Sequence, residues 1–389
     1  MTGGFVVSLF FAPDKIYTGA GCINEAGDAL TSLGKKALIV TGGHVVRLEC
    51  FEKLTAILEK GGVEYTVFSG ITGEPTDKMI EAGLDVYKSS GCDFIIGIGG
   101  GSPLDSMKAI AAMSVNRGKI ADYMGRVIGG KLPPMAAIPT TAGTGSEATQ
   151  FTVITDSENG IKMLLKGDVL VPDIAVIDPE FTISSPKSVT ASTGLDALTH
   201  AVEAYTSRKA QPLTDAVAAD AVRRIFEYLP RAYKDGSDKK AREEMSVAAL
   251  EAGFAINNSS VTIVHGMSRP IGALFHVPHG LSNAMLLSEC MAFACDGAYE
   301  KFARLGDITG VSKPSMTEKE KAEAFVAALG EICAVCEVPT LAEYGTDIEA
   351  FRRSIDKMSD DALASGSPGN TVKTVTKEDI VRLYEAVLK

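Results

Sequence analysis

The sequence predicts an N-terminal α/β domain with a parallel sheet, followed by an all-α C-terminal domain. The chain has 389 residues, more than one hydrophobic core usually supports, so two domains are expected. From residue 35 to about residue 178, short apolar runs alternate with longer amphipathic segments, which is the pattern of repeated β-α units. After Pro186 the strand signals stop and nearly every segment has helical periodicity. We therefore place the two domains at residues 1–185 and 186–389.

The first half contains five short runs that predict buried strands. Each run is bounded by turn signals, and amphipathic segments lie between them. Repeated units of this kind require a parallel sheet with helices on both faces. The preceding residues, MTGGFVVSLFFAP, lack a basic start and a cleavage site, so they predict an opening strand and not a signal peptide. The predicted strands are 37–40, 63–68, 93–98, 135–139 and 174–178, with helices near 47–61, 76–90 and 103–115.

Composition limits the classes of partner. The net charge of −11 and the pI near 5.1 argue against nucleic acid and anionic membranes as partners, because both need clustered Lys and Arg. No segment approaches the roughly 18 apolar residues of a membrane helix. Seven scattered cysteines form no disulfide framework, which favours a reducing cytoplasm. The pair Cys333 and Cys336 lies in an apolar helical pattern, and buried packing is favoured over redox chemistry there.

A glycine-rich loop follows the strand predicted at 93–98. The run Gly99-Gly100-Gly101 precedes a predicted helix, with Ser102 as its N-cap and Asp105 as a first-turn acid. Glycines at a helix N-terminus let backbone N–H groups approach a pyrophosphate, and the helix dipole favours the negative charge. The alternative is a tight turn without a ligand. The position of this glycine run between a strand and a helix favours a phosphate site.

A second loop, residues 140–147, follows the strand predicted at 135–139. Its threonines and glycines, TTAGTGSE, are suited to lining a ribose and a nicotinamide, although an ordinary turn is the alternative. Both loops lie at the carboxyl ends of predicted strands. Open α/β sheets bind their ligands at that edge, so the two loops predict one site.

Four of the five histidines lie between Thr193 and Gly280. Asp196 and His200 are four residues apart in a segment of helical periodicity, so both side chains can project from one face. The other three histidines follow within 80 residues of this pair in the same half of the chain. A carboxylate with several imidazoles suits Zn²⁺ or Fe²⁺. The alternative for the Asp-His pair alone is a solvated pair without a metal.

The amino-acid sequences of two segments resemble the signatures of the iron-containing (group III) alcohol dehydrogenase family. They are GLDALTHAVEAY and HGMSRPIGALFHVPHGLSNAMLL, and the resemblance runs from FFAPDKIYTGAG to PGN at 368–370. It implies a dehydroquinate synthase-like architecture, with NAD or NADP bound by the first domain and Fe²⁺ (or Zn²⁺) by the second. Matched residue by residue, the implied metal ligands are Asp196, His200, His265 and His279.

The resemblance also implies the residues that contact the cofactor. In the family a GGGS-x-x-D segment holds the NAD(P) pyrophosphate, and the second loop and a lysine contact the rest of the cofactor. The matching residues here are Gly99, Gly100, Gly101, Ser102, Asp105, Thr140, Thr141, Thr144 and Lys162.

Two positions depart from the family pattern. Gly42 stands where many members have an Asp that faces the adenosine ribose, so we expect NADP to be accepted. Arg269 stands where many members have a second His, near the substrate, that serves a proton relay. His276 is the candidate replacement for that relay, with a packing role as the alternative. Arg269 itself favours a substrate with an anionic end, such as a short semialdehyde, whereas a structural ion pair is the alternative.

Together these observations predict a cytoplasmic, metal-dependent oxidoreductase that transfers hydride between NAD(P)(H) and a small alcohol or aldehyde. We expect a homodimer or a higher homo-oligomer, with no nucleic acid and no membrane as partner. The alternatives are a zinc enzyme like glycerol dehydrogenase, a hydroxyacid-oxoacid transhydrogenase, a lyase like dehydroquinate synthase and a metal-binding protein without activity. Consumption of NAD(P)H on addition of an aldehyde would separate a dehydrogenase from the last two.

Overall fold

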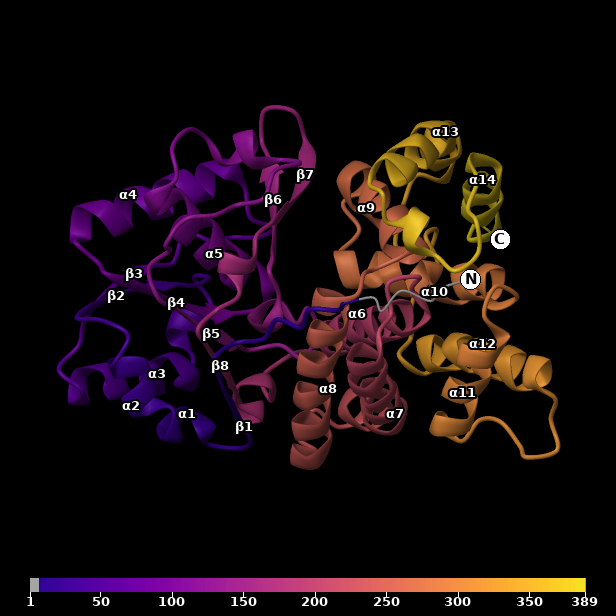
Figure 1. Cartoon of the computed structure of the whole chain (residues 1–389), viewed down its shortest axis with the longest axis horizontal. Coiled ribbons are helices and arrows are strands. Elements are labelled where there is room, and N and C mark those ends of the chain that lie inside the picture. Colours follow the sequence, from indigo (N-terminus) through magenta and orange to yellow (C-terminus); the bar gives the residue numbers. More distant parts are fainter. Residues whose placement is uncertain (1–6, 389) are drawn as a thin grey trace.

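The computed structural model describes residues 7–388. Figure 1 shows an α/β part, in indigo and magenta, beside a helical part in orange and yellow. The α/β part is built on a six-stranded sheet of order β1-β8-β5-β4-β2-β3, in which every neighbouring pair is parallel. The strands are β1 (Lys15–Thr18), β2 (Lys36–Val40), β3 (Glu64–Phe68), β4 (Phe94–Gly99), β5 (Met135–Pro139) and β8 (Ile174–Ile177).

Helices cover both faces of this sheet, as the continuous apolar strands require. On β2, Leu38 and Val40 pack on one face with residues of two helices, whereas Ala37 and Ile39 pack on the other with residues of three. Successive strand residues alternate between faces, so every position of these central strands must be apolar. The first face carries α4 (Asp77–Ser90) and α5 (Gly101–Val115), and the second carries α1 (Cys22–Glu25), α2 (Gly27–Thr31) and α3 (Glu49–Lys60).

Three sequence-based expectations about this part are wrong or incomplete. The predicted opening strand is absent from residues 7–13, and the rest of that prediction lies outside the described residues. Instead, the backbone N–H of Phe11 donates to Asn258 Oδ1 (2.5 Å), and its carbonyl accepts from Asn257 and Asn258. The sequence reading also missed the antiparallel hairpin of β6 (Phe151–Asp156) and β7 (Ile161–Lys166).

The third correction concerns the start of α5. The N-cap residue is Gly100 and not Ser102, so Asp105 lies beyond the first turn. Gly100 has an extended backbone and makes no side-chain cap hydrogen bond. The first-turn N–H groups of α5 are therefore not capped by a side chain.

The helical part begins with α6, directly after the last strand and a short 3₁₀ turn. Its longest helices, α6 to α8, pack against one another and form much of its core. The division at residue 185 stays a prediction. The helices are α6 (Lys187–Thr206), α7 (Pro212–Lys234), α8 (Lys239–Asn258), α9 (Ile263–Phe275), α10 (His279–Cys295), α11 (Tyr299–Thr309), α12 (Glu318–Val335), α13 (Ile348–Ala364) and α14 (Lys377–Ala386).

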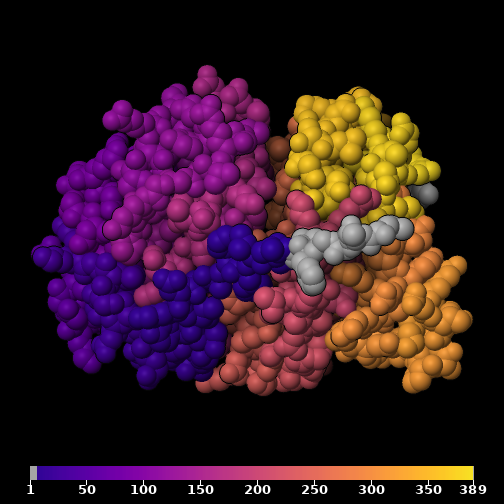
Figure 2. Space-filling model, in the orientation of Figure 1, coloured from indigo at the N-terminus to yellow at the C-terminus, as the bar shows by residue number. Residues whose placement is uncertain are grey.

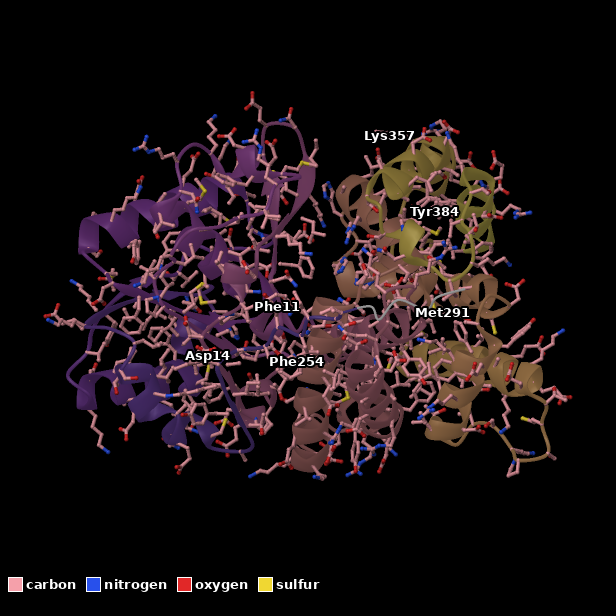
Figure 3. All side chains as sticks on the ribbon, in the orientation of Figure 1. Phe11, Asp14, Phe254, Met291, Lys357 and Tyr384 are labelled. Atoms are coloured by element: carbon pink, nitrogen blue, oxygen red, sulfur yellow. The ribbon has the colours of Figure 1, made fainter. Side chains whose placement is uncertain are left out.

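Helix α8 joins the two parts. Its Leu250 packs with Ala175 and Ile177 of β8, and Figure 3 labels Phe11 and Phe254 where the N-terminal segment crosses this helix. The loop after β5 also touches α8 closely, because a Cβ on Gly145 would lie 2.5 Å from the Cα of Gly253. Gly145 has φ +63, so both its backbone and its surroundings exclude larger residues.

Within residues 7–388, no single helix is long and apolar enough to cross a membrane. Helices α8 and α9 would meet the length and composition criterion only as a pair, and the chain bends by 103° between them. The seven cysteines are all free and buried. Burial raises the pKa of Cys333 and of Cys336 to about 12, which agrees with packing at that pair.

Candidate active site

Four side chains from three helices meet between the two parts of the molecule. Asp196 and His200 come from one face of α6, His265 from α9, and His279 is the first residue of α10. Their candidate ligand atoms all lie within 4.8 Å of one another. The Nε2 atoms of the three imidazoles lie 3.8–3.9 Å from Asp196 Oδ1. The structure thus brings together all four residues that the resemblance implied.

This donor set fits a divalent metal ion. Burial lowers the pKa of His265 well below its ordinary value and also lowers that of His279, which favours neutral imidazoles with free lone pairs. Burial raises the pKa of Asp196, but the nearby histidines and Asn283 outweigh it, so the pKa is lowered and the carboxylate is charged. Three imidazoles and one carboxylate are ligands that both Zn²⁺ and Fe²⁺ accept.

Two further residues, which the sequence reading did not single out, hold this cluster in place. Glu203 Oε2 lies 2.5 Å from His265 Nδ1, and Glu203 Oε1 accepts from Thr262 Oγ1 and from the Val264 N–H. Glu203 follows Asp196 by seven residues on α6, two helical turns along the same face, and that spacing was the available signal. The Nδ2 group of Asn283, on α10, donates to Asp196 Oδ1 over 2.7 Å.

A cavity of about 500 Å³ connects this cluster with the α/β part. Figure 2 shows the face hollowed between the α/β part and the C-terminal helices. The predicted residues that line the cavity come from both halves of the chain: Gly101, Ser102, Asp105, Thr144, Lys162, Asp196, His200, His265, Arg269 and His279.

The loops at the carboxyl ends of β4 and β5 fit a dinucleotide. Thr140 N–H donates to Gly99 O (2.8 Å), and Thr141 lies beside Gly100, so the two loops are adjacent. A Cβ on Gly101 would lie 2.7 Å from the side chain of Thr144, so only glycine keeps this space open. With the uncapped N-terminus of α5, these loops offer backbone donors to a pyrophosphate. The wall of the cavity does not include the other five predicted cofactor-binding residues, which are Gly42, Gly99, Gly100, Thr140 and Thr141.

Asp105 lines the cavity, but its carboxylate is already engaged. It accepts from Ser146 Oγ (2.6 Å) and from the Val153 N–H (2.8 Å), so it ties α5 to the second loop and to β6. Below it, the buried Lys108 Nζ donates to Thr149 O (2.8 Å) and Phe151 O (2.9 Å). These contacts give Asp105 a role in holding the loop.

Lys162 lines the cavity, whereas His276 does not. Lys162, on β7, points across to α9, where its Nζ would lie 3.0 Å from a Cβ on Gly272, and it is paired with Glu74 (2.7 Å). His276 is exposed, caps the end of α9 with φ 55, and is absent from the cavity wall. This position gives no support to His276 as the replacement for the relay histidine, which stays a prediction.

Comparisons with known proteins agree with this geometry. Residues 13–179 match the model of the family "Iron-containing alcohol dehydrogenase", and residues 190–388 match that of its C-terminal region. The chain is 34% identical over 382 residues to the NAD-dependent methanol dehydrogenase of Bacillus methanolicus, which covers 97% of this chain and 99% of that protein.

Two solved structures superpose on nearly the whole chain. A 1,3-propanediol oxidoreductase superposes with a TM-score of 0.95 at 33% identity, covering 98% of this chain and 100% of the other. A sulfoacetaldehyde reductase from Bifidobacterium kashiwanohense, in complex with NAD⁺, superposes with a TM-score of 0.88 at 27% identity, covering 98% and 99%. The chain belongs to the iron-containing alcohol dehydrogenase family, and it is an NAD(P)-dependent oxidoreductase that acts on alcohols.

Proposed function

We propose that this enzyme interconverts a small alcohol and its aldehyde at a metal ion held by Asp196, His200, His265 and His279. The single observation that supports this most is the shared cavity, which has the four-residue cluster on one wall and the uncapped N-terminus of α5 on the other. When bound, the metal supplies Lewis acidity to the alcohol oxygen, and the nicotinamide supplies or accepts the hydride. The residues of the chain then have to position both reactants.

The metal is Fe²⁺ in this proposal, with Zn²⁺ as the alternative. Support comes from the donor set of three imidazoles and one carboxylate, and from the iron-containing relatives. Glu203 sets the orientation of His265, and Asn283 sets that of Asp196. Both contacts fix the ligand atoms before any metal binds, which reduces the ordering that metal binding requires.

The cofactor lies across the edge of the sheet in this proposal. Its pyrophosphate is bound by the first turn of α5 and the glycines at 99–101, and its nicotinamide is directed along the second loop toward the metal cluster. Thr144 lines the cavity between them, Thr140 and Thr141 support it from the same loop, and Lys162 closes it from the hairpin side. The cavity between the two parts then shields the reacting carbon from water.

We further propose a cytoplasmic enzyme that assembles as a homodimer or a higher homo-oligomer. Seven buried free cysteines are typical of a reducing compartment. Strand β1 lies at the edge of the sheet, paired with β8 on one side, and unpaired edges are common surfaces for association. Light scattering on the purified protein measures the oligomeric state directly, and a monomer would contradict this part of the proposal.

The experiment that tests the activity uses purified enzyme with Fe²⁺ or Zn²⁺ restored. We expect NAD(P)H absorbance to fall on addition of a short aldehyde and to rise with the alcohol and NAD(P)⁺. Chelation should stop both reactions, and the metal should restore them. Turnover that is unchanged after complete removal of the metal would contradict the assignment of the four ligands.

A further inference from the structure

Arg269 lies on the cavity wall, one helical turn after His265 on α9. It is partly buried, and its Nη1 donates to Ser367 Oγ over 2.9 Å. Among residues 7–388 it forms no ion pair with a carboxylate, so the structural ion pair considered as the alternative is absent there. A guanidinium has five N–H donors, and this one uses a single donor in a hydrogen bond within the described part of the chain.

The acidic groups around the cavity are engaged elsewhere. Burial lowers the pKa of Arg269 and the charge of Glu203 opposes this, yet both Glu203 oxygens are used by Thr262, Val264 and His265. Glu74 pairs with Lys162, and Asp196 faces the three imidazoles. A partly buried cation without a carboxylate in direct contact is unfavourable, and an anion that enters the cavity would relieve this.

Ser367 completes a site for such an anion. Its oxygen accepts from Arg269, so its own O–H proton remains available to a ligand. Ser367 is itself buried, 5% exposed, and lies in the segment between α13 and α14 that forms one side of the cavity. That segment is held in place, since the Asn370 amide donates to Ser260 Oγ (2.8 Å) and Val261 O (3.2 Å).

We propose that Arg269 and Ser367 bind the anionic end of a short aldehyde, a carboxylate or a sulfonate, whose carbonyl faces the Asp196 cluster. The inference rests on the proposed function and specifies its substrate class. The cavity of about 500 Å³ must also admit the nicotinamide, so the chain between the two groups is short. The reaction balances as aldehyde plus NAD(P)H plus H⁺ giving the primary alcohol plus NAD(P)⁺. The hydride adds to the carbonyl carbon and the proton to its oxygen.

This site selects aldehydes with an anionic end over neutral aldehydes. Arg presents a planar fork that matches two oxygens of a carboxylate or sulfonate in parallel hydrogen bonds. A neutral aldehyde of equal length leaves the guanidinium unpaired and gains none of these bonds. The fold neighbour named as a sulfoacetaldehyde reductase supports the idea that this fold accepts an aldehyde with an anionic end.

The test compares matched aldehydes with the metal-loaded enzyme. Succinic semialdehyde is compared with butanal, and sulfoacetaldehyde with propanal, by kcat/KM. We expect the anionic member of at least one pair to be preferred by about 10- to 100-fold, mainly through a lower KM, since charge-assisted hydrogen bonds contribute free energies of that size. The pair with the larger preference shows whether a carboxylate or a sulfonate is the better fit.

Variants then locate the preference. Arg269→Gln should reduce the ratio to near unity, Arg269→Lys should keep part of it, and Ser367→Ala should lower it by a smaller factor. The matched control is Lys209→Gln, which removes an exposed cation from the wall of the same cavity and should leave the ratio unchanged. NAD(P)H binding, measured by fluorescence, checks that each variant is folded. If Arg269→Gln does not fold, the other two variants decide.

The outcomes separate the two proposals. If no aldehyde oxidises NAD(P)H, the proposed function fails. If butanal and propanal are reduced as efficiently as their anionic partners, and Arg269→Lys and Ser367→Ala leave the ratios unchanged, the anion site is excluded while the function stands. Loss of the preference in Lys209→Gln would assign it to a different cation and also overturn the inference.

Discussion

Glu203 and His265 lie on different helices, α6 and α9, with Glu203 Oε2 2.5 Å from His265 Nδ1. The contact is fully buried, and the second oxygen of Glu203 holds the start of α9 through Thr262 and Val264. A carboxylate at Nδ1 keeps the proton on that nitrogen, so the lone pair of His265 is on Nε2, the atom that faces Asp196. One glutamate therefore sets both the position and the tautomer of a proposed metal ligand.

Replacing this glutamate by glutamine should weaken metal binding. In Glu203→Gln the amide NH₂ can face Nδ1, which moves the imidazole proton to Nε2 and removes the lone pair from the site. We expect metal affinity to fall by about 10- to 100-fold, measured by competition with a chelator. The control is Glu227→Gln on the exposed face of α7, which should bind metal like the wild type. Equal affinities in both variants would reject the positioning role.

Removing a proposed ligand should have a larger effect than removing its support. His279→Ala deletes one of the four donors at the start of α10. We expect metal content after dialysis and turnover to fall together, by more than the roughly 100-fold expected for a supporting residue. The matched control is His276→Ala, three residues earlier and exposed, which should change neither quantity. A variant at His279 that keeps its metal would remove this residue from the ligand set.

Much of the sheet could be predicted because parallel strands buried on both faces must be apolar throughout. The central strands β2, β4, β5 and β8 lie within one residue of their predicted bounds. The hairpin β6–β7 was missed because its residues alternate between buried and exposed, with Val153 and Leu164 exposed on the cavity wall. This alternation was present in the sequence, but an alternation of only six residues in each strand is a weaker signal than a continuous apolar run.

Other features depend on contacts between distant residues. The N-terminal segment is fixed by Asn257 and Asn258, about 246 positions away, so its own apolar run was misleading. In the cluster, only the spacing of Asp196 and His200 carries local information. The approach of His265 and His279 depends on how α10 packs on α6 and on α9, and the family resemblance supplied it. The exposed position of His276 follows from a left-handed turn at the end of α9.

A stability prediction concerns Glu251, on α8. Burial raises its pKa to about 8, despite Arg224 at 3.4 Å, so the folded state binds its proton more tightly than the unfolded state. Its stabilising contribution is present below pH 4.5 and is lost as the pH rises through about 8. Glu251→Gln removes this dependence. The variant should gain stability relative to the wild type between pH 5 and 9, on the order of a few kcal/mol, because one pKa unit is about 1.4 kcal/mol.

Thermal unfolding at each pH measures this effect as a difference in Tm between the two proteins. The gap should widen with rising pH and level off above about pH 8. Glu243→Gln, on the exposed side of the same helix, serves as the control and should show no such trend. A gap that narrows with pH would mean that the ion pair with Arg224 dominates.

The last prediction concerns the cofactor and Gly42, which follows the end of β2 and bridges Gly70. Strand β2 neighbours β4, so Gly42 lies at the same sheet edge as the glycines at 99–101, where an acidic side chain would face the ribose and repel a 2′-phosphate. Without that acid, we expect the wild type to use NADPH as well as NADH. Gly42→Asp should lower kcat/KM for NADPH relative to NADH by about tenfold or more. A Cβ here would lie 3.1 Å from Ile71 O, so Gly42→Asn is the control for shape, and only the charged variant should change the ratio. A wild type that rejects NADPH, with both variants alike, would show that Gly42 has no part in this choice.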